Sequence, residues 1–139
     1  MFSNESIPQK EVIIAERAPK AIGPYSVGIR AFPLVFTAGQ VGIDRTTGEL
    51  VSGGVEAETR QVLLNLQNVL ESAGSSLSLV VKTTVFLLDM ADFTPMNTVY
   101  GEFFSEKPPA RSTVQVAALP KGAAVEIEAL ALVAEPVSD

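Results

Sequence analysis

Apolar residues between Val62 and Ala73 recur with the period of an α-helix, and this stretch is flanked by segments of strand character. The residues Val62, Leu66, Val69, Leu70 and Ala73 follow the i, i+4, i+7, i+8, i+11 spacing of one helical face. Gly74 follows directly and suits a left-handed helix end, while Glu56 and Glu58 lie in the expected first turn. The pattern predicts a helix from Val55 to Ala73.

Six other segments have the β-branched and apolar composition of strands, and one more has a helical face. The predicted strands are Glu11 to Ala15, Val27 to Ala31, Leu34 to Ala38, Val80 to Asp89, Arg111 to Ala118 and Val125 to Ala134. The second helix has Met96, Val99, Tyr100 and Phe103 on its face, and Pro108-Pro109 stops it. Val80 to Asp89 is apolar enough for an interior strand.

The order of these elements favours an α+β fold in which both helices pack on one face of a mixed sheet. The other face of so apolar a sheet would then be an exposed patch unless another subunit covers it, so we expect an oligomer. We expect a flexible N-terminal tail over residues 1–10 and a single domain over residues 11–135.

The composition excludes several kinds of chemistry. The chain has no cysteine and no histidine, which removes thiolate nucleophiles, the Ser-His-Asp triad and the usual zinc and haem ligands. A net charge of -6 disfavours general nucleic-acid binding. No apolar run is long enough for a membrane span, and residues 1–10 do not resemble a targeting signal, so we expect an intracellular protein.

Arg111 admits three interpretations from the residues alone. A strand arginine is most often an ion-pair partner, but its planar fork also suits a ligand carboxylate, and an RNA phosphate is a third choice. Glu126 and Glu128 share one face of their strand, where they are either solvated or, in a partly dry pocket, able to take a proton from water.

Five blocks of sequence resemble the RidA family, also called YjgF or perchloric-acid-soluble protein. The blocks are Ile22-Gly23-Pro24-Tyr25-Ser26, Thr37-Ala38-Gly39-Gln40, Val81-Lys82-Thr83-Thr84-Val85, Pro109-Ala110-Arg111-Ser112, and Leu119-Pro120-Lys121-Gly122 with Val125-Glu126-Ile127-Glu128-Ala129. The resemblance implies a chorismate-mutase-like α+β fold, homotrimers with sites between subunits, and cofactor-independent hydrolysis of imines and enamines such as 2-aminoacrylate and 2-iminobutyrate to 2-keto acids and ammonia. From the N-terminal residues we expect a cytoplasmic location, or a mitochondrial one if an upstream segment was lost.

By the same resemblance, Arg111 binds the substrate carboxylate and Glu126 positions or activates water. Tyr25 and Asn97 match residues of the ligand cleft, and Gly39 and Thr113 match positions whose backbone contacts the ligand. Two departures are Ala38, where many members have Ser, and Thr113, where many have Cys. The first puts any role of that hydroxyl in doubt.

Strand geometry adds an expectation about assembly. If the two strands are antiparallel, Arg111 and Glu126 lie at opposite ends, ~15 to 20 Å apart. We therefore expect Arg111, Thr113 and Asn97 to come from one subunit, and Gly39, Glu126 and Tyr25 from its neighbour. The alternative functions are an endoribonuclease that inhibits translation, and a non-enzymatic keto-acid-binding protein or chaperone.

Overall fold

The protein is described over residues 9–134 by a computed structural model. Its strands are β1 (Glu11–Val12), β2 (Gly28–Ala31), β3 (Leu34–Thr37), β4 (Gln40–Val41), β5 (Val80–Leu87), β6 (Ala110–Gln115) and β7 (Val125–Leu132). They form one sheet in the order β1-β2-β3-β7-β5-β6, with β4 also paired to β7. Only β5 and β6 are parallel among these pairs. The mixed sheet predicted from the sequence is confirmed, and most of the predicted tail lies outside the described residues.

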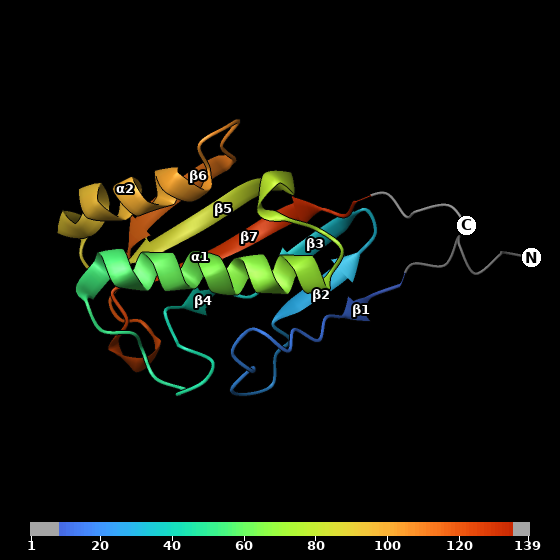
Figure 1. Cartoon of the computed structure of the whole chain (residues 1–139), viewed down its shortest axis with the longest axis horizontal. Coiled ribbons are helices and arrows are strands. Elements are labelled where there is room, and N and C mark those ends of the chain that lie inside the picture. The colour runs from blue at the N-terminus through green and yellow to red at the C-terminus, as the bar shows by residue number, and fades with distance from the viewer. Residues whose placement is uncertain (1–8, 135–139) are drawn as a thin grey trace, which may run out of the picture.

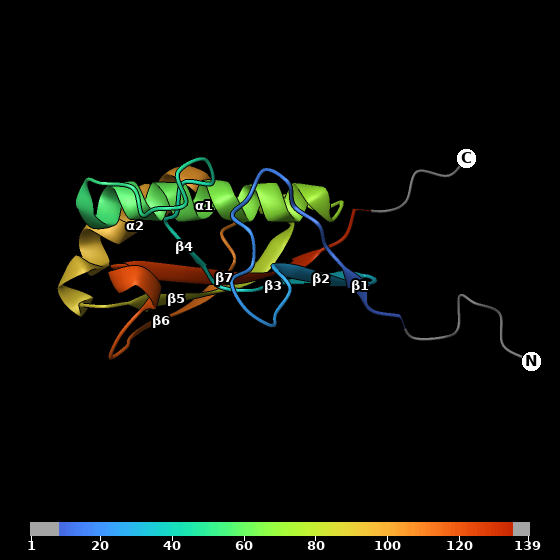
Figure 2. The same ribbon diagram turned by 90° about the horizontal axis from the view of Figure 1, so that it is seen from below.

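The two helices, α1 (Gly54–Ser72) and α2 (Phe93–Phe103), lie on the same face of the sheet (Figures 1 and 2). The face of α1 predicted from the sequence is fully buried, since Val62, Leu66, Val69, Leu70 and Ala73 are all 0% exposed. The expected packing of both helices on one side of the sheet and the expected buried face of α1 are therefore confirmed. No helix in the described part of the chain is long and apolar enough to cross a bilayer.

Strand β7 shows how the sheet separates its two faces. Val125, Ile127, Ala129 and Ala131 are buried in the core beneath the helices. The alternate residues Glu126, Glu128, Leu130 and Leu132 point to the opposite side, which we call the open face, because successive strand residues point to opposite sides. Figure 2 shows no helix beneath this side of the sheet. The open face also carries exposed apolar side chains, namely Val12, Phe36, Leu88, Val114 and Leu132.

Several predicted bounds were wrong. β1 has two residues instead of five, and the strand β4 was not predicted. α2 ends at Phe103 rather than at the Pro108-Pro109 pair, because Phe104 turns its ring into the core. Glu58 was expected only to carry favourable charge in the first turn of α1, but it also makes a tertiary contact. Its side chain is buried, and its Oε1 accepts a hydrogen bond of 2.8 Å from the backbone N–H of Ala124.

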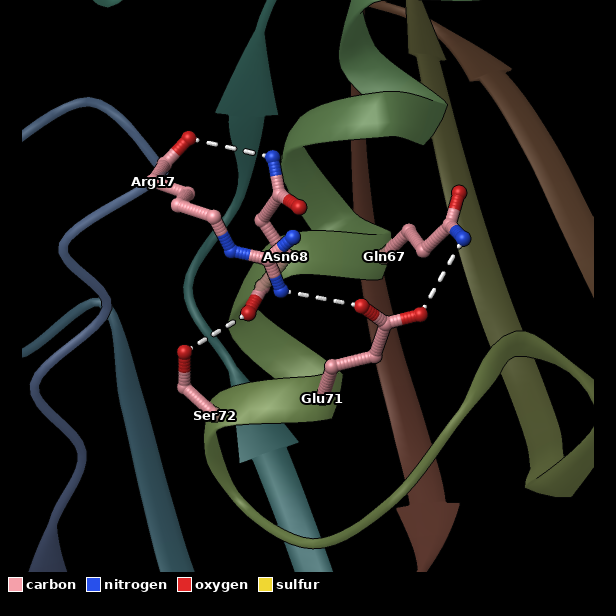
Figure 3. Close-up of polar contacts among 5 residues, drawn as sticks. All are labelled: Arg17, Gln67, Asn68, Glu71 and Ser72. Atoms are coloured by element: carbon pink, nitrogen blue, oxygen red, sulfur yellow. Dashed lines mark hydrogen bonds and ion pairs between the residues drawn. The ribbon is translucent and has the colours of Figure 1, made fainter.

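A polar network fastens the segment between β1 and β2 to the end of α1 (Figure 3). Arg17 forms an ion pair of 3.0 Å with Glu71, and the backbone carbonyl of Arg17 accepts a 3.0 Å hydrogen bond from Asn68. Gln67 donates to the second carboxylate oxygen of Glu71 at 3.1 Å. The hydrogen bonds from Gln67 and Arg17 lower the pKa of Glu71. This segment continues into the loop that carries Tyr25.

Candidate active site

Arg111 lies on β6 beside two aromatic rings of α2. It is the register partner of Thr83 on β5, whose buried side chain contacts α2, so Arg111 points to the same side. Its guanidinium carbon Cζ is 4.7 Å from the ring centroid of Tyr100 and 5.5 Å from that of Phe93. We call Tyr100 and Phe93 the aromatic pair. Both distances are within the range of cation-π attraction.

No carboxylate pairs with Arg111 in the described part of the chain. The ion pairs between residues 9 and 134 are Arg17–Glu71, Arg30–Glu11 and Arg60–Glu102. The structural ion-pair interpretation of Arg111 is therefore not supported by the fold of a single chain. Arg111 is half-buried, and stacking on the two rings leaves the N–H groups at the edge of its guanidinium free to donate to a ligand. Two parallel N–H groups of this edge fit a carboxylate.

Asn97 and Thr113 lie on the same side of the sheet as Arg111. Asn97 is placed at i+4 from Phe93 and at i-3 from Tyr100, so all three residues share one face of α2. The Oδ1 of Asn97 is buried and has no hydrogen-bond partner among the described residues. Thr113 follows Arg111 by two positions on β6 and shares its face. Within one chain, Arg111, Thr113 and Asn97 therefore lie on the helix-covered side of the sheet.

Glu126 on β7 and Gly39, between β3 and β4, lie against each other. The side chain of Glu126 points to the open face, away from Arg111. A Cβ atom added to Gly39 would lie 2.9 Å from Cγ of Glu126 and closer still to its carboxylate. Any larger residue at position 39 would therefore displace the side chain of Glu126 from its present position. Burial, and secondarily the charge of Glu128, raise the pKa of Glu126. A carboxylate with a raised pKa is a better proton acceptor than a fully solvated one.

Tyr25 is half exposed and lies on the irregular loop before β2. Its hydroxyl accepts a hydrogen bond of 3.2 Å from the backbone N–H of Ile22. Tyr25 also lines a hollow of about 580 Å³, together with other residues between positions 12 and 27 and with Arg45. The backbone N–H of Ala38 donates to the carbonyl of Val27 at 2.9 Å. This bond brings the loop that carries Tyr25 alongside the strand end that carries Gly39.

The two groups of residues cannot meet within one chain. Arg111 is level with Thr83 on β5, and Glu126 is level with Phe86, three residues further along. Two strand spacings and three strand rises put Arg111 and Glu126 ~14 Å apart. They also point to opposite faces, since Thr83 faces the helices and Phe86 the open face. β6 and β7 run antiparallel as expected, although β5 lies between them.

The fold and these residues define a class: a small α+β protein with a free guanidinium suited to an anionic small molecule and a separate carboxylate of raised pKa. No cluster of three metal-ligating side chains occurs between residues 9 and 134. A family model described as Endoribonuclease L-PSP matches residues 15–133. The chain belongs to this family, which is the RidA/YjgF family that its sequence resembles.

Individual relatives are similar over nearly the whole chain. A RutC family protein from Pyrococcus horikoshii is 55% identical over 88% of this chain and 97% of its own length. The human 2-iminobutanoate/2-iminopropanoate deaminase is 46% identical over 88% of this chain and 90% of its own. A crystal structure of Escherichia coli TdcF with bound serine superposes with a TM-score of 0.85 at 41% identity, covering 89% of this chain and 99% of that one.

The aromatic pair was not among the site residues predicted from the sequence. Tyr100 was assigned to the buried face of α2, and Phe93 was assigned no role. The i, i+4, i+7 spacing of Phe93, Asn97 and Tyr100 was the available signal, because it places both rings beside a predicted cleft residue.

Proposed function

We propose that the protein hydrolyses reactive 2-imino acids and their enamine tautomers, such as 2-iminobutyrate and 2-aminoacrylate, to 2-keto acids and ammonia. The observation that carries the proposal is the guanidinium of Arg111, which is stacked on the aromatic pair and unmatched by a carboxylate within residues 9–134. Relatives named as imine deaminases support the substrate class. The serine bound to TdcF supports a ligand that carries both a carboxylate and an amino nitrogen.

The residues of the two groups divide the reaction between them. Arg111 binds the substrate carboxylate through two parallel N–H donors and so fixes the imine carbon in space. Glu126 accepts a proton from water, the hydroxide oxygen bonds to the imine carbon, and a proton is delivered to the nitrogen. The resulting carbinolamine loses ammonia and leaves the keto acid. Because imines hydrolyse readily in water, orientation and one base suffice, and no cofactor is required.

We further propose a homotrimer in which each site lies between subunits. Arg111, Thr113 and Asn97 would come from one subunit, and Gly39, Glu126 and Tyr25 from its neighbour. Two properties of the chain support this arrangement: the ~14 Å separation of Arg111 and Glu126 on opposite faces, and the exposed apolar residues of the open face. The expected compartment is the cytoplasm, to be tested by fractionation.

A coupled assay tests the activity. A dehydratase generates 2-iminobutyrate in the presence of semicarbazide, which traps the imine, and release of 2-oxobutyrate is followed with wild type and with Arg111→Ala. We expect the wild type to accelerate release and Arg111→Ala to lose most of this acceleration. No acceleration by the wild type, or an unchanged rate in the variant, contradicts the proposal. RNA serves as the control substrate for the endoribonuclease alternative.

Subunit complementation tests the assembly. Arg111→Ala and Glu126→Ala are each expected to be inactive, but mixed trimers contain interfaces that join an intact Arg111 to an intact Glu126. Random mixing in equal amounts restores about a quarter of the sites, as each site draws one residue from each of two subunits. If one chain carried the whole site, mixing would restore nothing. A monomer in solution at assay concentration would equally contradict the trimer.

A further inference from the structure

We propose that Tyr100, held by its hydrogen bond to Thr83, positions the guanidinium of Arg111 to receive the substrate carboxylate. Thr83 and Tyr100 are then positioning residues, which act through Arg111 without contacting the substrate. The inference rests on the proposed function in one respect, namely that Arg111 binds a carboxylate. Its structural part, the dependence of the Arg111 geometry on the Thr83–Tyr100 pair, can be tested independently.

The ring of Tyr100 is held by a hydrogen bond at its hydroxyl and by packing against a neighbouring ring. The hydroxyl groups of Tyr100 and Thr83 are 2.7 Å apart, and the two residues are only 5% and 0% exposed. The ring centroid of Phe104 lies 4.7 Å from that of Tyr100, and the two rings are tilted by 40°. In this buried position water cannot replace a lost hydroxyl partner, so the bond between Thr83 and Tyr100 selects one ring orientation.

The place of Thr83 in the sheet links this bond to Arg111. Thr83 and Arg111 are register partners on the parallel strands β5 and β6. The phenol of Tyr100 therefore meets two neighbouring strand positions, with its hydroxyl on Thr83 and its ring face 4.7 Å from Cζ of Arg111. A shift of the ring along either strand would carry the stacking surface away from the guanidinium.

Arg111 has little else within the chain to hold its head group. Its guanidinium makes no hydrogen bond or ion pair to residues 9–134, and the second ring, Phe93, is further away at 5.5 Å. A free arginine side chain loses several rotamers when it binds a ligand, which weakens binding. Stacking on a fixed ring removes part of this entropy loss beforehand while leaving the N–H edge open.

Burial also keeps the phenol in the form that this arrangement requires. Burial raises the pKa of Tyr100, although the Thr83 hydrogen bond and the Arg111 charge act in the opposite direction. The hydroxyl therefore stays protonated at neutral pH, and Arg111 keeps its positive charge available for a ligand because it does not face a phenolate.

Two substitutions remove the bond while retaining the shape of the site. Tyr100→Phe keeps the ring, and Thr83→Val keeps the volume at the strand position, whereas Thr83→Ser restores a hydroxyl. The readouts are the Kd for 2-oxobutyrate by calorimetry, the KM and kcat for imine hydrolysis, and the Nε–Hε signal of Arg111 in NMR spectra of the ¹⁵N-arginine-labelled protein. That signal is displaced by the ring current of Tyr100 and reports the stacking directly.

We expect Tyr100→Phe and Thr83→Val each to weaken 2-oxobutyrate binding about 5-fold, the typical effect of one buried hydrogen bond. KM should rise by a similar factor with kcat changed less than about 2-fold, because the bond acts on binding rather than on the water or its base. The Arg111 signal should move toward its random-coil position in both variants, and Thr83→Ser should restore signal and affinity.

Thr59→Val is the matched control. The hydroxyl of Thr59 is fully buried and donates to the carbonyl of Val55 at 2.7 Å within α1, so its loss removes a comparable bond away from Arg111. Binding and the Arg111 signal should be unchanged. An unmoved Arg111 signal in Thr83→Val and Tyr100→Phe would overturn the inference, as would equal weakening by Thr59→Val. If the wild type neither binds 2-oxobutyrate nor accelerates imine hydrolysis, the proposed function is wrong, whereas the Arg111 signal still decides the positioning.

Discussion

Gly39→Ala should disturb the protein through a single contact, the one with Glu126. The added Cβ would lie 2.9 Å from Cγ of Glu126. Because Cγ is near the root of the side chain, the whole carboxylate must rotate away rather than bend at its tip. Gly39 does not have a left-handed φ, so alanine fits its backbone. Because the clashing atoms belong to a flexible, partly exposed side chain, the displacement costs less than overpacking in a core, ~0.5–1.5 kcal/mol.

A double-mutant cycle measures this contact. Urea unfolding should show Gly39→Ala destabilised by ~0.5–1.5 kcal/mol in the wild-type background and by much less in Glu126→Ala, where the clashing atoms are gone. Imine hydrolysis by Gly39→Ala should fall toward that of Glu126→Ala. Gly101→Ala is the control, since a Cβ there meets nothing within 4 Å and helix α2 should gain about 1 kcal/mol. Equal destabilisation by Gly39→Ala in both backgrounds would refute the reasoning.

Three further outcomes are expected. Leu66→Ala, at a position with 0% exposure, should cost ~2–5 kcal/mol in urea unfolding, and a cost below about 1 kcal/mol would contradict the packing described. Asn65→Leu should cost ~1–3 kcal/mol, because its Nδ2 donates to the buried backbone carbonyls of Val41 and Ile43, and hydrogen exchange should accelerate around β4. The wild type should lose stability as pH rises from the ordinary pKa of a glutamate through the raised pKa of Glu126, since the folded state binds that proton more tightly, and Glu126→Gln should abolish this loss. The gain at pH 7 should stay below about 1 kcal/mol because the side chain is partly exposed, and a less stable variant at pH 7 would contradict it.

Much of the fold follows from apolar periodicity. The buried face of α1 and the alternation along β7 are visible in the sequence, and the strand-helix order places both helices on one face. Two short elements could not be predicted. β1 and β4 have two residues each, and a pairing that short depends on neighbouring strands rather than on its own composition. Helix α2 ends before its prolines because Phe104 is recruited to the core, which local signals do not reveal.

The candidate site could be predicted in its residues but only partly in its geometry. The resemblance supplied Arg111 and Glu126. Strand length predicted a separation of ~15 to 20 Å between them, close to the ~14 Å that the sheet register gives. Arg111 and Glu126 point to opposite faces because β5 lies between their strands and pairs with each in a fixed register. No local sequence pattern reveals that register. The aromatic pair beneath Arg111 was missed for a similar reason. Tyr100 has the spacing of a core residue, and only the tertiary structure shows that one face of its ring is used by a cation.

A crystal structure of the protein with 2-oxobutyrate tests the central claim most directly. We predict that the ligand carboxylate makes two N–H contacts to Arg111 above the ring of Tyr100. Glu126 and Gly39 of a neighbouring subunit should lie around the keto carbon. A carboxylate bound away from Arg111, or a site closed by residues of one chain alone, would contradict the account.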